Sequence, residues 1–307
     1  MHLKYFLLLC MLFVSTTCVS AQENLTLEHD DENRSYHLFI PENFDAETSN
    51  GLLLVLHGAG MAGSEMQAVG GFDDLAAAHN MLVAYPDGIL NGWIYLDEEQ
   101  LHPADVFTND MEFLPLLIEE LVTEYELDAA SVYVAGYSNG GMMALRMLCD
   151  DGGSLAGVGV IAANFSLRLV EHCMDVTPSP LAIFLGTEDT AFPWTGYAYM
   201  RDDGFFRSRF SVAQMMGFLS TLYRCDIHDD PQRVEASNSP VSVIRDSHSD
   251  CANNASVALF ALVDATHQYP FLPRLQLSNG NSGTIMAALF DFWGLEPVDN
   301  TPDDTDE

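Results

Sequence analysis

The chain has 307 residues, 48% of them hydrophobic, and a formal net charge of −34 at pH 7. No linker-like run or internal repeat interrupts it, so we expect one large domain rather than two small ones. So acidic a surface repels nucleic acid and anionic lipid, which excludes both as expected partners and predicts solubility in a saline habitat.

The first 21 residues have the organisation of an export signal. Lys4 supplies the positive end, Leu7 to Val14 the apolar core, and Val19-Ser20-Ala21 a small-residue cleavage site. The apolar run is too short to span a bilayer well, and a lipid anchor at Cys18 fits less well because no convincing lipobox precedes it. We therefore expect residues 1–21 to be removed and the protein to be secreted or periplasmic. Residues 22–296 form the predicted domain, and the acidic stretch 297–307 is expected to be disordered.

Cysteines outside the export signal predict disulfides. They are Cys149, Cys173, Cys225 and Cys251, an even number in a chain expected to be exported. Four cysteines allow three pairings, and we favour the sequence-local one, Cys149 with Cys173 and Cys225 with Cys251. No Cys-x-x-Cys or His-x-x-x-His spacing indicates a zinc site.

Apolar runs of strand length alternate with helix-like segments over most of the chain. This pattern is typical of an α/β fold, a mostly parallel central sheet with helices on both faces. Strands are predicted at Tyr36–Ile40, Leu52–His57, Met81–Tyr85, Val132–Ala135, Gly157–Ala162, Ala182–Leu185 and Val257–Val263. Helices are predicted at Gly71–His79, Asp110–Tyr125, Gly140–Cys149, Val212–Tyr223 and Thr284–Trp293. The segment Gly196–Phe210 breaks the rhythm and could form a lid or rim.

The most informative motif is Gly136-Tyr137-Ser138-Asn139-Gly140, between a predicted strand and a predicted helix. A serine on a sharp strand-to-helix turn with small neighbours is the nucleophile elbow of an α/β-hydrolase. The glycines permit the strained turn that lifts the serine hydroxyl above the sheet. Ser138 is therefore the candidate nucleophile.

A serine hydroxyl needs a base to take its proton and an acid to orient that base. In α/β-hydrolases the chain order is serine, acid, histidine. Asp189 and His267 follow predicted strands in that order, so all three should meet beyond the carboxyl ends of the strands. Glu188 competes with Asp189. The alternative histidines, His172, His228 and His248, follow no predicted core strand.

The negative oxygen formed during acyl transfer needs amide donors. One candidate is the N–H of Asn139, directly after the nucleophile, and the other is the N–H of Ala59 in the loop His57-Gly58-Ala59-Gly60. This chemistry, acyl transfer to water, requires no cofactor and no metal.

With these motifs the chain resembles the secreted polyhydroxybutyrate-depolymerase and feruloyl-esterase-like group, often placed in carbohydrate esterase family one. The resemblance rests on Leu56-His57-Gly58, Gly71-Phe72-Asp73-Asp74-Leu75-Ala76, Val83-Ala84-Tyr85-Pro86-Asp87-Gly88, Gly136 to Ala144, Gly186-Thr187-Glu188-Asp189 with Pro193, and Thr266-His267-Gln268-Tyr269-Pro270. It spans about residues 50 to 293 and implies an α/β-hydrolase domain with Ser138, Asp189 and His267 as its triad. It also implies that the four cysteines occupy positions where such enzymes often have bridges.

The chain departs from the family pattern beside the expected acyl pocket. The family usually has glycines before the catalytic histidine and a tryptophan soon after it, whereas this chain has Val263-Asp264-Ala265-Thr266 and then Tyr269. Trp194 and Tyr197 could stack on an aromatic acyl group or a sugar, or could simply pack. With His57 they are the expected substrate-binding residues.

These features predict a serine esterase acting on an ester substrate that is polymeric or oligomeric. The expected substrates are feruloyl or acetyl esters of plant polysaccharide. The alternative is a short-chain polyhydroxyalkanoate such as polyhydroxybutyrate. A non-catalytic binding module and a peptidase on the same fold are the rival functions.

Overall fold

The computed structural model describes residues 21–30, 32–96, 109–200, 202, 206–234, 236–237, 242–268, 274–276 and 282–297. Nearly all of the predicted export signal and of the acidic tail lies outside the described residues, so both assignments stay predictions. Ala21, the last residue of the predicted signal, is the first residue of strand β1 (Ala21–His29).

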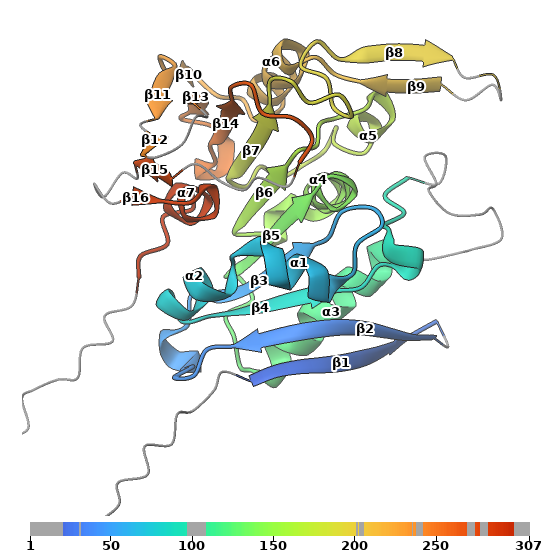
Figure 1. Cartoon of the computed structure of the whole chain (residues 1–307), viewed down its shortest axis with the longest axis vertical. Coiled ribbons are helices and arrows are strands. Elements are labelled where there is room, and N and C mark those ends of the chain that lie inside the picture. Colours follow the sequence, from blue (N-terminus) through green and yellow to red (C-terminus); the bar gives the residue numbers. More distant parts are fainter. Residues whose placement is uncertain are drawn as a thin grey trace, which may run out of the picture.

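One large sheet runs through the molecule (Figure 1). The parallel strands at its centre are, in spatial order, β4 (Met81–Pro86), β3 (Gly51–Leu56), β5 (Val132–Tyr137), β6 (Gly157–Ile161), β7 (Leu181–Gly186) and β14 (Val257–Leu262). Antiparallel strands extend both edges: β1 and β2 (Glu32–Ile40) beside β4, and β13 (Val243–Ser249), β10 (Ile227–His228) and β11 (Gln232–Val234) beside β14. The mostly parallel sheet expected from the sequence is confirmed.

The central strands are apolar along their whole length because both of their faces are covered. Leu52, Leu54 and Leu56 of β3 pack into one hydrophobic core, and Leu53 and Val55 pack into the other. Successive side chains of a strand point to opposite faces, so a continuous apolar run is what a doubly covered strand requires.

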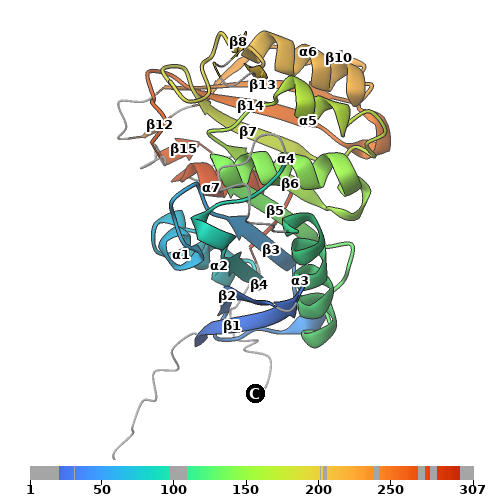
Figure 2. The same ribbon diagram turned by 90° about the vertical axis from the view of Figure 1, so that its right-hand side faces the viewer.

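Helices cover the two faces unequally (Figure 2). One core receives α3 (Asp110–Glu124), α4 (Asn139–Asp151), α5 (Leu167–Glu171) and α6 (Val212–Leu222), and the other receives α1 (Gly63–Gly70), α2 (Asp73–Ala78) and α7 (Ile285–Phe292). Single 3-10 turns lie at Ala46–Thr48, Ile89–Asn91, Gly152–Ser154 and Ala252–Asn254. A small sheet joins β12 (Ala236–Ser237), β15 (Arg274–Gln276) and β16 (Ser282–Gly283).

The segment Gly196–Phe210, expected as a lid or rim, forms a two-stranded hairpin of β8 (Tyr197–Met200) and β9 (Phe206–Arg209). It projects from the body of the molecule beside α5 and α6 (Figure 1). The last residues of β8 are exposed, with Tyr199 at 51% and Met200 at 63% of their full accessibility. At its base Ser208 and Arg209 are buried.

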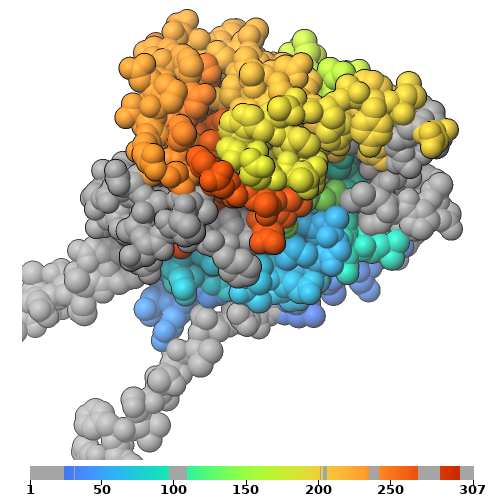
Figure 3. All heavy atoms as spheres, turned by 45° about the horizontal axis from the view of Figure 1, so that its top comes forward, coloured from blue at the N-terminus to red at the C-terminus, as the bar shows by residue number. Residues whose placement is uncertain are grey.

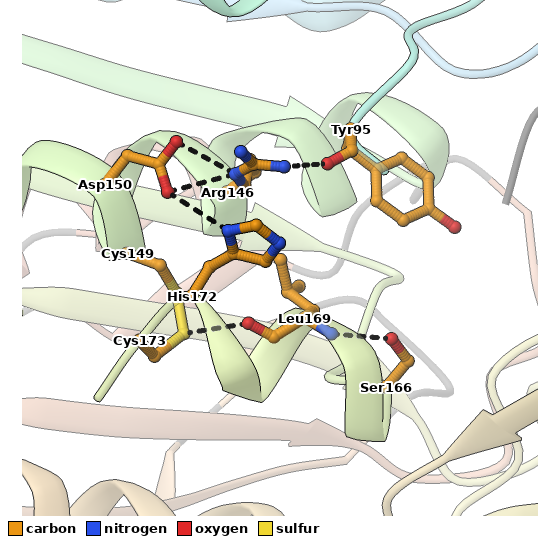
Figure 4. Close-up of a disulfide and its surroundings, with 8 residues drawn as sticks. All are labelled: Tyr95, Arg146, Cys149, Asp150, Ser166, Leu169, His172 and Cys173. Atoms are coloured by element: carbon orange, nitrogen blue, oxygen red, sulfur yellow. Dashed lines mark hydrogen bonds and ion pairs between the residues drawn. A yellow bond between two sulfur atoms is a disulfide. The ribbon is translucent and has the colours of Figure 1, made fainter. Parts of the chain in front are cut away.

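Two disulfides join the pairs that sequence proximity favoured. Cys149 bonds to Cys173, and Cys225 bonds to Cys251. Figure 4 shows the first bridge connecting α4 to the residues that follow α5. On the same helix, Arg146 forms an ion pair with Asp150 and donates a hydrogen bond to the carbonyl of Tyr95 (Figure 4). Each bridge closes a loop of about 25 residues, which stabilises the fold by about 3 kcal/mol in the chain-entropy account.

Candidate active site

Ser138 lies at the turn between β5 and α4 with φ 54° and ψ −112°. A non-glycine residue with positive φ is strained, and such strain is typical of functional positions. The neighbouring glycines make the turn possible, because a Cβ at Gly136 would lie 2.2 Å from the carbonyl oxygen of Gly140. A Cβ at Gly140 would lie 2.2 Å from the carbonyl oxygen of Leu56. The predicted elbow geometry is thus present.

The three side chains predicted to act together are hydrogen-bonded in series. Ser138 Oγ lies 2.9 Å from Nε2 of His267, and Nδ1 of His267 lies 2.8 Å from Oδ2 of Asp189. His267 follows β14, Asp189 follows β7 and Ser138 follows β5, so all three come after the carboxyl ends of parallel strands, at one edge of the sheet. The Asp189 side chain is fully buried and the His267 side chain is 25% exposed, which leaves the imidazole open to a substrate.

The alternatives to these residues lie elsewhere. Glu188 is exposed, and its N–H donates to the carbonyl of Ala265. His172 lies 3.8 Å from Asp150, which is at the C-terminal end of α4, near the first disulfide (Figure 4). His228 stacks on His248 with ring centroids 4.5 Å apart, at the β10–β13 edge of the sheet. Among the described residues, the hydrogen-bond partner of the Ser138 hydroxyl is His267 and none of these.

Aromatic rings hold the imidazole in place. The His267 ring lies between Tyr137 and Phe192, with centroid distances of 5.7 and 5.5 Å. The Tyr137 hydroxyl donates to the carbonyl of His267 at 3.2 Å. Burial, and secondly the charge of Asp189, raises the pKa of Tyr137, so this hydroxyl stays a donor at neutral pH.

The two expected oxyanion donors come from different elements. Asn139 is the first residue of α4, and its N–H therefore has no partner within the helix. Ala59 is exposed in the loop after β3, where Gly60 donates its N–H to the carbonyl of Asn91 at 2.7 Å. Gly58 packs so closely on Tyr137 that a Cβ there would lie 2.7 Å from its ring.

His57 is a correction to the sequence prediction. It was expected to contact substrate, but its side chain is completely buried. Both ring nitrogens are used within the protein: Nδ1 lies 2.9 Å from the carbonyl of Gly58, and Nε2 accepts from the N–H of Gly88 at 2.9 Å. His57 therefore shapes the loop and does not reach the substrate.

The side chain of Asn139 makes a contact that the sequence did not indicate. Its Oδ1 accepts from the N–H of Trp93 at 2.7 Å, and its Nδ2 donates to the carbonyl of Trp93 at 3.1 Å. Trp93 is buried, and its indole N–H donates to the carbonyl of His57 at 3.0 Å. The partners are 46 residues apart in the chain, and no local pattern signals the contact.

The remaining predicted substrate residues, Trp194 and Tyr197, follow Phe192 in the chain, and Phe192 packs on the His267 ring. Trp194 is half-buried against the core, between Phe192 and the hairpin. Tyr197 opens β8 opposite Arg209, whose guanidinium lies 5.2 Å from the Phe192 ring. A hollow of about 280 Å³ at the hairpin base is lined by Tyr197, Arg209, Phe210 and Gln214, among others. In Figure 3 the lime segment after β7 and the orange-red segment after β14 meet on one face, next to the light-blue region of α1.

Metal-ligating side chains gather away from this site. Within the described part of the chain, His29, Asp30 and Glu112 bring one candidate ligand atom each to within 4.8 Å of one another. They lie at the β1–β2 turn and the first turn of α3, and none of them contacts the triad. Among the described residues, no helix combines the length and hydropathy needed to cross a bilayer.

Comparison with solved structures identifies the fold. An acetyl xylan esterase from Aspergillus awamori superposes with a TM-score of 0.60 at 12% identity, covering 90% of this chain and 100% of that one. A mutant of the feruloyl esterase module from Clostridium thermocellum, complexed with sinapinate, gives a TM-score of 0.52 at 10% identity over 82% of this chain and 83% of that one. The chain has the fold of the α/β-hydrolase esterases.

Sequence comparison also finds esterases. A Nocardia uniformis subsp. tsuyamanensis protein named "Putative esterase NocK" is 32% identical over 148 residues, 47% of this chain and 42% of the relative. Feruloyl esterase C of Emericella nidulans is 26% identical over 171 residues, 53% of this chain and 57% of the relative. The alignments thus span less than two-thirds of either relative's length. No protein-family model matches the chain.

Proposed function

We propose that this protein is a secreted serine esterase that hydrolyses acyl esters of plant polysaccharides or their fragments. The observation that carries the proposal is the hydrogen-bonded series from Ser138 through His267 to Asp189 on a strained elbow. The resemblance to feruloyl and acetyl xylan esterases supports the substrate class. The two disulfides and the predicted export signal support secretion.

In the proposed reaction Ser138 Oγ attacks the ester carbonyl while Nε2 of His267 takes the hydroxyl proton. Asp189 accepts the Nδ1 hydrogen of His267 and stabilises the imidazolium that forms. The N–H groups of Asn139 and Ala59 donate to the oxyanion of the tetrahedral intermediate, with the N-terminus of α4 adding a favourable dipole. The C–O bond then breaks, and His267 returns the proton to the leaving alcohol.

Deacylation repeats these steps with water. Water attacks the acyl-serine carbonyl as His267 removes its proton, and collapse of the second intermediate releases the carboxylic acid and regenerates Ser138. All groups needed for both halves come from the chain itself. We assign contacts with the sugar side of the ester to the half-buried Tyr197 and to the hollow beside Arg209.

The test is labelling with a fluorophosphonate probe, followed by peptide mapping, on the wild-type protein and on Ser138→Ala. We expect the label on Ser138 alone and turnover of 4-nitrophenyl acetate only by the wild-type protein. Label at another residue, or unchanged turnover by the alanine variant, would overturn the proposal. The purified protein is then compared on methyl ferulate, acetylated xylan and polyhydroxybutyrate film. Release of hydroxybutyrate with no action on methyl ferulate or acetylated xylan would replace our substrate class with the polyester alternative.

A further inference from the structure

We propose that Trp93 is a positioning residue that holds the two oxyanion donors of the esterase at a fixed separation. The inference rests on the function proposed above and assigns a role to a residue outside the triad. Asn139 belongs to α4 and Ala59 to the loop after β3. Trp93 lies between these elements and hydrogen-bonds to both sides.

On the helix side the contact is bidentate. The carboxamide of Asn139 uses its oxygen and its nitrogen on the N–H and the carbonyl of one residue, Trp93, at 2.7 and 3.1 Å. Two hydrogen bonds to the N–H and the carbonyl of one residue fix orientation as well as distance. The residue whose main chain supplies one oxyanion donor is therefore tied by its side chain to Trp93.

On the loop side the contact runs through His57. The Trp93 indole N–H donates to the carbonyl of His57 at 3.0 Å, and the two rings pack with centroids 4.9 Å apart. His57 in turn contacts Gly58, directly before Ala59, through Nδ1. Since the carbonyl of Gly58 can only accept and the N–H of Gly88 can only donate, the imidazole is neutral with its proton on Nδ1.

Trp93 is itself held from a third direction. The N–H of the next residue, Ile94, donates to Oδ2 of Asp110 at 2.8 Å. Asp110 is completely buried and forms an ion pair of 2.7 Å with Arg34. The bridge is thus anchored at the helix, at the loop and at a buried ion pair, which is the preorganisation that an oxyanion site needs.

The consequence is kinetic. Oxyanion donors stabilise the transition state and contribute little to binding of the ester ground state, so their misplacement lowers kcat more than it raises KM. A displacement of about 1 Å in such a site can lower the rate by about 100-fold. Loss of one anchor of the bridge should therefore lower kcat by about 10-fold to 100-fold.

The experiment uses two variants that leave every catalytic group in the chain. Trp93→Phe removes the indole N–H, and Asn139→Ala removes the two side-chain bonds and keeps the backbone donor. Each is compared with wild type for kcat and KM on 4-nitrophenyl acetate, per active site counted by fluorophosphonate titration. The inhibition constant of a trifluoromethyl ketone, whose adduct with serine carries an oxyanion, is measured in parallel.

Matched controls separate positioning from stability. Trp293→Phe makes the same substitution at a tryptophan whose indole nitrogen has no hydrogen-bond partner among the described residues and whose ring packs on Tyr133, at the opposite end of β5 from Ser138. Asn80→Ala removes an equivalent bidentate contact, which Asn80 makes with the main chain of Asp45 before β4 begins. These controls should keep their kcat per active site, whatever their effect on the melting temperature.

We expect both test variants to lose kcat and trifluoromethyl-ketone affinity by similar factors, with KM changed less than threefold. Values of kcat and inhibition constant within twofold of wild type in Trp93→Phe would overturn the inference, as would equal losses in the controls. If Ser138→Ala also kept full activity, the proposed function itself would fall. If that variant is inactive and Trp93→Phe behaves as wild type, only the positioning role is wrong.

Discussion

The two carboxylate oxygens of Asp189 accept hydrogen bonds from different partners, and His267 bonds to one oxygen only. Oδ2 accepts the Nδ1 hydrogen of His267 at 2.8 Å, while Oδ1 accepts the N–H groups of Ala191 and Phe192, each at 2.8 Å. The second pair of bonds fixes the carboxylate, which in turn fixes the imidazole. Orientation of the base is thus built into the loop after β7.

This arrangement predicts the effect of Asp189→Asn. The two amide donors require the carboxamide oxygen of the new residue, so its NH₂ group would face His267 Nδ1 and force the proton onto Nε2. An imidazole in that tautomer cannot accept the Ser138 proton, and kcat should fall by about 10⁴-fold. The measurement is kcat on 4-nitrophenyl acetate, with the exposed neighbour Glu188→Gln as control. A variant that keeps a tenth of wild-type kcat would contradict this role for Asp189.

The sequence predicted the triad because its members follow core strands, and such strands are recognisable as apolar runs. It did not predict β13, whose residues Arg245, Asp246 and Ser247 give no strand-like apolar pattern. This strand forms because β14 offers a pairing edge, which is a tertiary effect. Helix α1 was missed as well, since it begins and ends with glycine and its N-cap, Ala62, makes no side-chain cap.

The wrong prediction for His57 has a physical explanation. A histidine directly after a strand can face a substrate or turn back into the protein, and its neighbours in the sequence do not distinguish the two cases. The choice here depends on Gly88 and Trp93, more than 30 residues away, which supply its hydrogen-bond partners. The same distance in sequence hid the contact between Asn139 and Trp93.

Glycine 140 should tolerate no side chain. Its Cβ would meet the carbonyl oxygens of Leu56 and His57 at 2.2 and 2.5 Å, and both are backbone atoms that cannot rotate away. Gly140→Ala should therefore displace the elbow and the oxyanion loop, destabilising the protein by about 1–3 kcal/mol and lowering kcat.

The contrasting variant is Gly217→Ala in α6. That position is exposed, and a Cβ there meets nothing within 4 Å, so helix propensity alone should stabilise the protein by about 0.5–1 kcal/mol. Denaturant unfolding of both variants checks the pair. Equal and small effects would mean that the elbow is less tightly packed than these contacts indicate.

The buried His57 should make stability depend on pH. Desolvation lowers its pKa below the ordinary 6.5, so in mildly acid solution the unfolded chain binds a proton that the folded protein does not. The contribution of His57 to the free energy of unfolding is therefore complete above pH 6.5. It is lost as the pH falls from 6.5 towards the pKa of the folded protein, by at most about 1.4 kcal/mol per pH unit.

His57→Gln keeps an acceptor for the N–H of Gly88 and cannot titrate. The excess unfolding free energy of wild type over this variant should therefore shrink as the pH is lowered from 7.5 to 5. Other groups that titrate over this range do so equally in both proteins, so their effect cancels in the difference. Urea unfolding at four or five pH values provides the measurement. Two stability curves that run parallel over this range would show that His57 takes up its proton equally in the folded and unfolded states.

The exposed hairpin should matter for polymers and not for small esters. Tyr199 follows Tyr197 by two residues, so both side chains lie on the same face of β8, and their ring centroids are 5.5 Å apart. Half-exposed aromatic rings offer apolar faces on which sugar rings can stack, at about 1 kcal/mol each. Tyr199→Ala should then lower kcat/KM on acetylated xylan by about 5-fold and leave kcat/KM on 4-nitrophenyl acetate unchanged, because the residue lies outside the triad and the oxyanion loop.

Ile227→Ala, at an equally exposed apolar residue on β10, serves as the control. If kcat/KM fell in the same proportion on the polymer and on the small ester, the hairpin would be acting on the catalytic residues. If kcat/KM on the polymer did not fall, the hairpin would not belong to the binding surface.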